Sequence, residues 1–372
     1  MLAATTPVQR PADAKLLVVD SFGAVTDARR STFVDWLRPG DVVVANDAAT
    51  LPASLSGRHV RTGSEIEVRL AGRGSLSPAD VHSFVAVVFG AGDFHTPTER
   101  RPLPPALSPG DRLALGPLDA TVARLLDHPR LVSIAFDGTA DAIWAGIARH
   151  GRPIQYAHLP IALSLWDVWT SIAGRPVAFE PPSAGFVLDW HTLRDMRERG
   201  IEFFTITHAA GISSTGDDAL DARLPLDEPY EIPRATATAI NRALADRRRI
   251  VAIGTTVVRA LEHAATGRRT ICAGRGVATG RITAATRLRI VDAVFSGVHE
   301  PTTSHYQLLG AFADADTLRR ADEAMNALGY RTHEFGDSVL LDRRDQERLG
   351  SLDRPFKTQE TRRSGELLEA TS

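Results

Sequence analysis

The stretch Val251-Ala-Ile-Gly-Thr-Thr-Val-Val-Arg-Ala-Leu-Glu262 contains a short apolar run that stops at a glycine and continues with helical spacing. The run has the length of a strand, and Gly254, Thr255 and Thr256 stand where the helix would begin. Arg259 follows one helical turn later. Such a junction gathers backbone N–H groups, two hydroxyls and a cation, which favours binding of a phosphate or carboxylate. An ordinary capped helix behind a buried strand is the alternative interpretation.

Two other segments bring a histidine to the end of a predicted strand. Phe204-Thr-Ile-Thr-His208 alternates like a strand and ends in an imidazole. The segment Ile290-Val-Asp-Ala-Val-Phe-Ser-Gly-Val-His-Glu-Pro301 does the same with His299, and a predicted helix then opens with three hydroxyl-bearing residues, Thr302, Thr303 and Ser304. Imidazoles exchange protons near neutral pH, so His208 and His299 are candidate acid–base groups. A hydrogen-bonded structural histidine is the alternative for either one.

The chain as a whole predicts an α/β (mixed α+β) fold in which a mixed-sheet domain is interrupted by an inserted small antiparallel β-barrel. Residues 57–138 consist of short alternating segments separated by Gly and Pro, which is typical of a small barrel. Residues 1–56 and 139–342 form the discontinuous α/β catalytic domain, and 343–372 are predicted to be a flexible tail. In the second part of the α/β domain, strands are expected at 177–179, 202–207, 250–253, 288–293 and 338–341, and helices at 189–199, 234–246, 256–265, 303–312 and 316–328.

Composition excludes several classes of protein. The 372 residues carry 43 basic and 45 acidic side chains, so a net charge of -2 gives no general attraction to nucleic acid, although a local arginine patch stays possible. Cys272 is the single cysteine, which excludes intrachain disulfides and a multi-thiolate metal centre. The histidines show no His-Glu-x-x-His spacing, so no metal site is predicted. Because no apolar stretch approaches membrane-spanning length, we expect no membrane contact and a cytoplasmic location.

Several short blocks resemble the S-adenosylmethionine:tRNA ribosyltransferase-isomerase family of queuosine biosynthesis. That family carries Gly-Thr-Thr-x-Val-Arg-x-Leu-Glu, similar to residues 254–262 here. Its Arg-Pro-Gly-Asp-x-x-Val-x-Asn-Asp resembles residues 38–47, and its Pro-Thr-Ala-Gly resembles Pro182-Ser-Ala-Gly185. Further blocks are Glu228-Pro-Tyr-Glu-Ile232, Ala239-Ile-Asn241 and Phe335-Gly-Asp337. The resemblance covers nearly the whole chain, and so many blocks would rarely fall in one order by chance.

The resemblance implies an enzyme and a set of site residues. The family moves the ribosyl part of S-adenosylmethionine onto the 7-aminomethyl-7-deazaguanine base of a tRNA, giving epoxyqueuosine and releasing adenine and methionine. The sulfonium acidifies the C5′ protons, so the reaction needs a base, an acid for adenine and a clamp for the methionine carboxylate, but no separate cofactor. His208, His299 and Glu228 are the expected catalytic groups. The expected substrate-binding residues are Asn46, Asp47, Ser183, Gly185, Thr255, Thr256, Arg259, Thr303 and Ser304.

The chain also departs from the family pattern at chemically important positions. Val187 and Leu226 replace two family histidines, and Ala49 replaces an arginine. The loop Arg281-Ile-Thr-Ala-Ala-Thr286 replaces a Phe-Ile-x-Pro-Gly-Tyr segment. The acceptor therefore stays open between tRNA and a small nucleobase or amine, and a non-catalytic ligand- or RNA-binding descendant is the third alternative. The sequence leaves the oligomeric state open and is compatible with a monomer.

Overall fold

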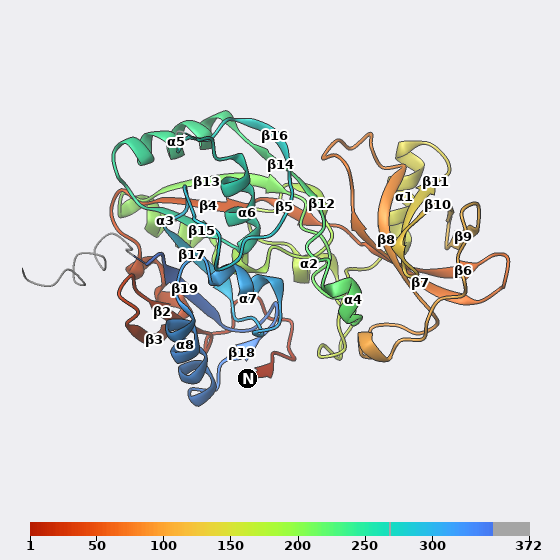
Figure 1. Ribbon diagram of the computed structural model, residues 1–372, viewed down its shortest axis with the longest axis horizontal. Coiled ribbons are helices and arrows are strands. Elements are labelled where there is room, and N and C mark those ends of the chain that lie inside the picture. Colours follow the sequence, from red (N-terminus) through yellow and green to blue (C-terminus); the bar gives the residue numbers. More distant parts are fainter. Residues whose placement is uncertain (268, 345–372) are drawn as a thin grey trace, which may run out of the picture.

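A mixed α/β body and a closed β-barrel lie side by side along the longest axis of the molecule (Figure 1). The computed structural model describes residues 1–267 and 269–344. It confirms the predicted fold class, a mixed sheet with an inserted antiparallel barrel. Positions 345–372 of the predicted tail lie outside the described residues, while Arg343 is anchored to Asp292 through its backbone N–H and through its guanidinium. No helix of the described residues is long and apolar enough to cross a membrane.

Nine strands form the central sheet in the spatial order β16-β14-β13-β4-β15-β17-β19-β2-β3. Their bounds are β2 (Lys15–Val19), β3 (Val25–Arg29), β4 (Val42–Asn46), β13 (Glu202–His208), β14 (Glu228–Ile232), β15 (Ile250–Ile253), β16 (Gly274–Ala278), β17 (Ala293–Gly297) and β19 (Ser338–Asp342). Strand β4 pairs in parallel with β13 and β15, and β15 pairs in parallel with β17. The carboxyl ends of these four strands therefore meet at one edge of the sheet, where open α/β sheets bind ligands.

Helices cover both faces of this sheet because its central strands are apolar on both sides. In β4, Val42 and Val44 join the core cluster packed by α5, α6 and α8, while Val43 and Ala45 join the cluster on the opposite face, which includes residues of α3. Such strands read as continuous apolar runs, as parallel strands buried on both faces do. The helices are α1 (Ala140–His150), α2 (Leu165–Val168), α3 (Trp190–Glu198), α4 (Asp218–Asp221), α5 (Arg234–Ala245), α6 (Thr255–Ala264), α7 (Ser304–Leu309) and α8 (Ala315–Ala327), with short 3-10 turns η1 (Arg30–Trp36), η2 (Thr98–Arg100) and η3 (Ser183–Val187).

The barrel has six strands in the closed order β10-β11-β8-β7-β6-β9. These are β6 (Ser54–His59), β7 (Glu65–Gly72), β8 (Ser83–Phe89), β9 (Arg112–Leu115), β10 (Leu118–His128) and β11 (Leu131–Phe136). Strand β5 (Ala48–Thr50) enters the barrel segment and β12 (Arg175–Ala178) lies beyond it; the two pair in parallel and so join the two ends of the insertion. The remaining short strands, β1 (Leu2–Ala3) and β18 (Arg331–Thr332), pair with each other.

One predicted strand is wrong. Residues 288–293 were expected to be extended, but the strand β17 begins at Ala293 and ends at Gly297. The apolar residues before it are buried, yet their backbone N–H groups do not bond to a neighbouring strand. The carboxylate of Glu262 accepts them instead, from Arg289, Ile290 and Val291 at 2.7, 2.9 and 2.9 Å. A side chain distant in the sequence therefore supplies the hydrogen-bond acceptors for the backbone of this segment. The periodicity of apolar residues does not reveal such a contact.

Candidate active site

A pocket opens at the carboxyl edge of the parallel strands. Its empty volume, which includes open solvent at the mouth, is about 890 Å³. Seven of the residues singled out from the sequence line it: Ser183, Glu228, Thr255, Thr256, Arg259, His299 and Ser304. They come from segments far apart in the chain, and the parallel strand order is what brings them together.

The start of helix α6 presents two hydroxyls to this pocket. Gly254 is the N-cap residue at φ 98°, a conformation that glycine adopts without strain, and no side chain caps the helix. Thr255 and Thr256, expected at capping positions, are the first two helical residues. Within the described residues neither hydroxyl has a protein hydrogen-bond partner. Unbonded hydroxyls and N–H groups at a helix N-terminus form a suitable site for a carboxylate.

Arg259 lines the pocket, but its guanidinium is bonded to the protein. It contacts the Glu228 carboxylate, and it donates to the backbone oxygens of Leu226, Ala278 and Gly280 at 2.8, 2.9 and 3.3 Å. The side chain was one of those expected to bind substrate. In the fold it joins strands β14 and β16 to helix α6, so its first effect is to hold Glu228 in place.

Glu228 is a buried carboxylate with donors on both oxygens. Oε1 accepts the Gly211 N–H at 2.6 Å, and Oε2 is paired with Arg259. Burial raises the pKa of this carboxyl, whereas Arg259 and the Gly211 N–H act in the opposite direction. The group is thus fixed at the pocket wall, with its charge state set by the balance between burial and Arg259.

His208 lies behind Glu228 rather than in the pocket lining. Its Nε2 is 3.2 Å from Glu228 Oε2, but the angle does not make a hydrogen bond, and both ring nitrogens are buried without a partner. Burial and the nearby Arg259 lower the pKa of His208 to about 3, so the ring is neutral near pH 7. His208 therefore adjoins the pocket only through Glu228.

His299 does reach the pocket, together with a second imidazole that the sequence reasoning missed. Its Nε2 lies 3.1 Å from the hydroxyl of Ser296, and its ring meets the ring of His305 edge to face at 4.7 Å. Burial lowers the pKa of His299 well below its usual value, and His305 and His333 add to that effect. A neutral His299 has one unprotonated ring nitrogen that can accept a proton.

Glu180 is the other titratable residue that sequence reasoning missed. It lines the pocket just before Ser183, and its Oε1 accepts the hydroxyl of Tyr156 at 2.5 Å. Burial raises the pKa of Glu180 to about 7, while hydrogen bonds from Ser213 and Tyr156 oppose the increase. Its place in Phe179-Glu-Pro-Pro182, directly before the Pro-Ser-Ala-Gly block, was the available signal. A carboxyl with this pKa can act as acid or base at neutral pH.

Four expected substrate-binding residues lie outside the lining. The Asn46 amide bonds to the backbone of His208 and Ala48, and the Asp47 carboxylate accepts two threonine hydroxyls at 2.9 and 2.6 Å. Gly185 is buried where an added Cβ would meet the side chain of Thr170 at 2.9 Å. Thr303 caps helix α7 by accepting the N–H of Tyr306. Each therefore supports strand or helix ends around the pocket.

Comparison with known proteins assigns the family. The family model described as queuosine biosynthesis protein matches residues 1–341. The chain belongs to the queuosine biosynthesis protein family. Relatives named S-adenosylmethionine:tRNA ribosyltransferase-isomerase include those of Thermus thermophilus, 32% identical over 338 residues, covering 88% of this chain and 92% of the relative, and Syntrophotalea carbinolica, 31% identical over 322 residues, covering 84% and 88%.

A solved structure is also similar to the chain. The S-adenosylmethionine tRNA ribosyltransferase of Thermotoga maritima is 21% identical, with coverage of 91% of this chain and 96% of that one and a TM-score of 0.47. The two positions where family histidines are replaced lie outside the pocket lining. Val187 belongs to an apolar core cluster of the sheet, and Leu226 packs against the barrel core.

Proposed function

We propose that the chain is an S-adenosylmethionine:tRNA ribosyltransferase-isomerase, which transfers the ribosyl moiety of S-adenosylmethionine to a 7-aminomethyl-7-deazaguanine base and releases adenine and methionine. The observation that carries the proposal is the pocket of this family member. It combines an anion-binding helix start with a neutral imidazole and two buried carboxyl groups. These are the kinds of group that the reaction needs, namely a carboxylate site, a proton acceptor and a proton donor.

The N-terminus of α6 binds the methionine carboxylate in this proposal. The free hydroxyls of Thr255 and Thr256 and the first N–H groups of the helix supply the donors. Arg259 acts indirectly, because its bonds to Glu228 and to three carbonyl oxygens fix the pocket wall beside this site. Ser183 and Ser304, whose hydroxyls also line the pocket, are then the residues placed to contact the ribose.

Proton transfer falls to His299 and Glu180. His299 is neutral, so it takes the proton from C5′ of the sulfonium substrate, and Ser296 orients its ring. Glu180, with a pKa of about 7, is protonated in a large fraction of molecules and gives its proton to the departing adenine. The same carboxylate can then accept a proton from the attacking amine. Glu228, which is paired with Arg259, stays the third candidate.

Adenine release from S-adenosylmethionine tests the proposal directly. The assay compares a tRNA that carries 7-aminomethyl-7-deazaguanine, the same tRNA with guanine, and the free deazaguanine base. Release with the modified tRNA alone, together with epoxyqueuosine in the recovered tRNA, is the expected result. Release with the free base but not with the tRNA would replace tRNA by a small-molecule acceptor. No release with any acceptor contradicts the proposal.

Salt dependence separates the two acceptors in a binding measurement. A tRNA held through phosphate contacts releases counterions, so its affinity should fall steeply as salt concentration rises. A small neutral base should bind with little salt dependence. A flat salt profile for tRNA, or no binding at low salt, counts against tRNA as the partner.

A further inference from the structure

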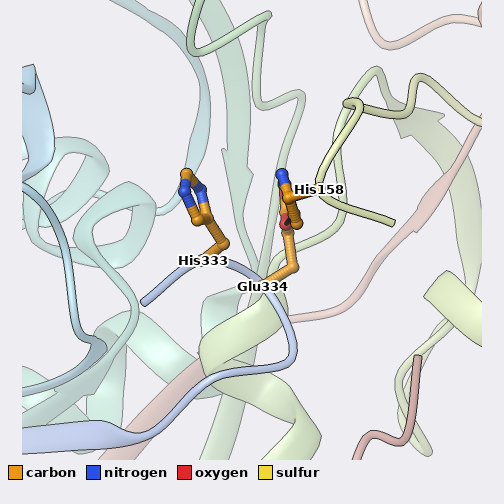
Figure 2. Close-up of side chains that lie close together, drawn as sticks. All are labelled: His158, His333 and Glu334. Atoms are coloured by element: carbon orange, nitrogen blue, oxygen red, sulfur yellow. Dashed lines mark ion pairs between the residues drawn. The ribbon is translucent and has the colours of Figure 1, made fainter. Parts of the chain in front are cut away.

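Two histidines and a glutamate meet beside the pocket from two distant loops. His158 lies in the connection between α1 and α2, whereas His333 and Glu334 follow β18. The imidazole rings of His158 and His333 lie face to face, with centroids 4.2 Å apart and planes 18° from parallel, and the Glu334 carboxylate lies against His158 (Figure 2). One potential ligand atom from each residue lies within 4.8 Å of the other two.

Two of these side chains have buried atoms that the protein leaves without a hydrogen-bond partner. His158 Nε2 and Glu334 Oε2 form a close ion pair at 3.3 Å, but its geometry falls short of a hydrogen bond. Their side chains are only 14% and 21% exposed. Among the described residues this buried nitrogen and carboxylate oxygen have no polar partner besides each other, and such weakly satisfied buried groups are suited to hold a bound cation.

The backbone that carries the cluster is held in an unusual conformation. His333 has φ 69°, in the left-handed region that non-glycine residues seldom adopt. The Asp337 carboxylate fixes the loop by accepting the N–H groups of Arg331 and Lys15, both at 2.7 Å. The Gly336 N–H closes the turn on the His333 oxygen at 3.0 Å. Strained residues that are held by their surroundings concentrate at functional sites.

We propose that His158, His333 and Glu334 bind a divalent transition-metal ion of the zinc type. Two imidazole nitrogens and one carboxylate oxygen are a recurrent zinc ligand set, with a fourth position left to water or another ligand. Imidazole ligands favour such ions over Mg²⁺ and Ca²⁺. The rings must turn from their parallel arrangement to direct both nitrogens at one ion, and the terminal torsion of histidine permits this because it is broad.

The site adjoins the pocket wall without forming part of the pocket lining. Glu334 interacts electrostatically with Glu180 and His305, two of the lining residues. The spacing of histidines in the sequence predicts no metal site, because these ligands come together only in the fold. The proposal does not rest on the proposed function, since it concerns metal binding by this cluster whatever the acceptor.

Calorimetric titration of the full, untagged chain with ZnCl₂ tests the site. The chain is first treated with a chelator, and it carries Cys272→Ser because the exposed Cys272 thiol could itself bind zinc. We expect saturable binding of one ion per chain and no comparable binding of Mg²⁺. His158→Gln and Glu334→Gln should each weaken zinc binding by about 100-fold or more, since even loss of a partner of a ligand costs about 10- to 100-fold.

His128 provides a matched control. It forms a similar pair with Asp217, at 3.4 Å and with side chains 13% and 28% exposed, but that pair lies outside the proposed ligand set. His128→Gln should leave zinc affinity unchanged. Circular dichroism establishes that each variant is folded. The absorption spectrum of bound Co²⁺ reports the loss of a ligand independently of the calorimetric titration. Absence of saturable zinc binding by the parent chain overturns the proposal, as does equal binding by folded His158→Gln and Glu334→Gln variants.

Discussion

Replacing Arg259 by methionine should destabilise the protein strongly, because the guanidinium is buried and fully engaged. The side chain is 7% exposed, as is that of its partner Glu228. Methionine keeps much of the apolar stem but removes the charge and every N–H donor. The Glu228 carboxylate then loses its cation, and three backbone oxygens, those of Leu226, Ala278 and Gly280, lose a donor.

The magnitude follows from the cost of leaving one member of a buried ion pair. Breaking such a pair typically costs about 3 to 5 kcal/mol of unfolding free energy. Burial already raises the pKa of Glu228, so this carboxyl can take up a proton once Arg259 is gone, which limits the loss to that range. With a urea m-value of about 3 kcal/mol/M, the unfolding midpoint should fall by roughly 1 M or more.

Urea unfolding followed by tryptophan fluorescence measures this shift, and Arg175 supplies the control. Arg175, in β12, pairs at 2.8 Å with Glu231, which lies in the same strand as Glu228, β14. The side chains of Arg175 and Glu231 are 37% and 31% exposed. Arg175→Met should therefore cost about 1 kcal/mol or less. Adding Glu228→Gln to Arg259→Met should cost less than the two single changes together. A midpoint shift no larger than that of Arg175→Met would refute the buried pair as described.

Three further predictions follow from single residues of the site. His299→Asn should slow adenine release by about 100- to 10,000-fold while calorimetry shows S-adenosylmethionine still bound; near wild-type turnover would move the base elsewhere. Burial raises the pKa of Glu180 from 4.5 to about 7. The contribution of this carboxyl to the stability of the folded state is therefore complete below pH 4.5 and is lost as the pH rises through 7. The loss should reach about 3 kcal/mol in wild type and be absent in Glu180→Gln, and parallel pH–stability curves for the two would contradict the assigned pKa. Gly254→Ala, at φ 98°, should cost about 1 to 2 kcal/mol in thermal unfolding, whereas Gly74→Ala, which meets no atom within 4 Å, should not; equal effects would argue against strain.

Sequence periodicity predicts most of the fold because local patterns and burial agree. The segment Val42–Ala45 is apolar throughout and forms most of β4, a central strand buried on both faces. The segments of 57–138 alternate, and Gly and Pro separate them; five of the six barrel strands lie within this range, and β6 begins just before it. Periodicity fails where long-range side-chain bonds replace strand pairing. Glu262, which binds three successive backbone N–H groups before β17, is the clearest example.

The site is harder to predict than the fold because a polar residue at a strand end has two possible uses. Asn46 and His299 both follow apolar runs, yet the Asn46 amide is bonded to the backbone around β13 while His299 faces the pocket. Only the neighbouring strands decide between these outcomes. Glu180 escaped sequence reasoning for a related reason, since its significance comes from Tyr156 and from burial, neither of which is local in the chain.

The places in the fold where the two family histidines are replaced limit the effect of these replacements on the pocket. Val187 lies in the core beneath the sheet and Leu226 packs on the barrel, so neither side chain lines the pocket. The lining itself still contains two imidazoles and two carboxyl groups that can exchange protons. Loss of the two family histidines therefore leaves titratable groups of both kinds in the pocket lining. Any difference in acceptor should then arise from the walls of the pocket, where Arg281 and Ile282 come from the altered loop at 281–286. Grafting the family's Pro-Gly-Tyr loop onto this segment should shift the preference between acceptors. The rate of adenine release per bound S-adenosylmethionine should stay within about tenfold of the original rate. An unchanged preference would place acceptor choice outside this loop.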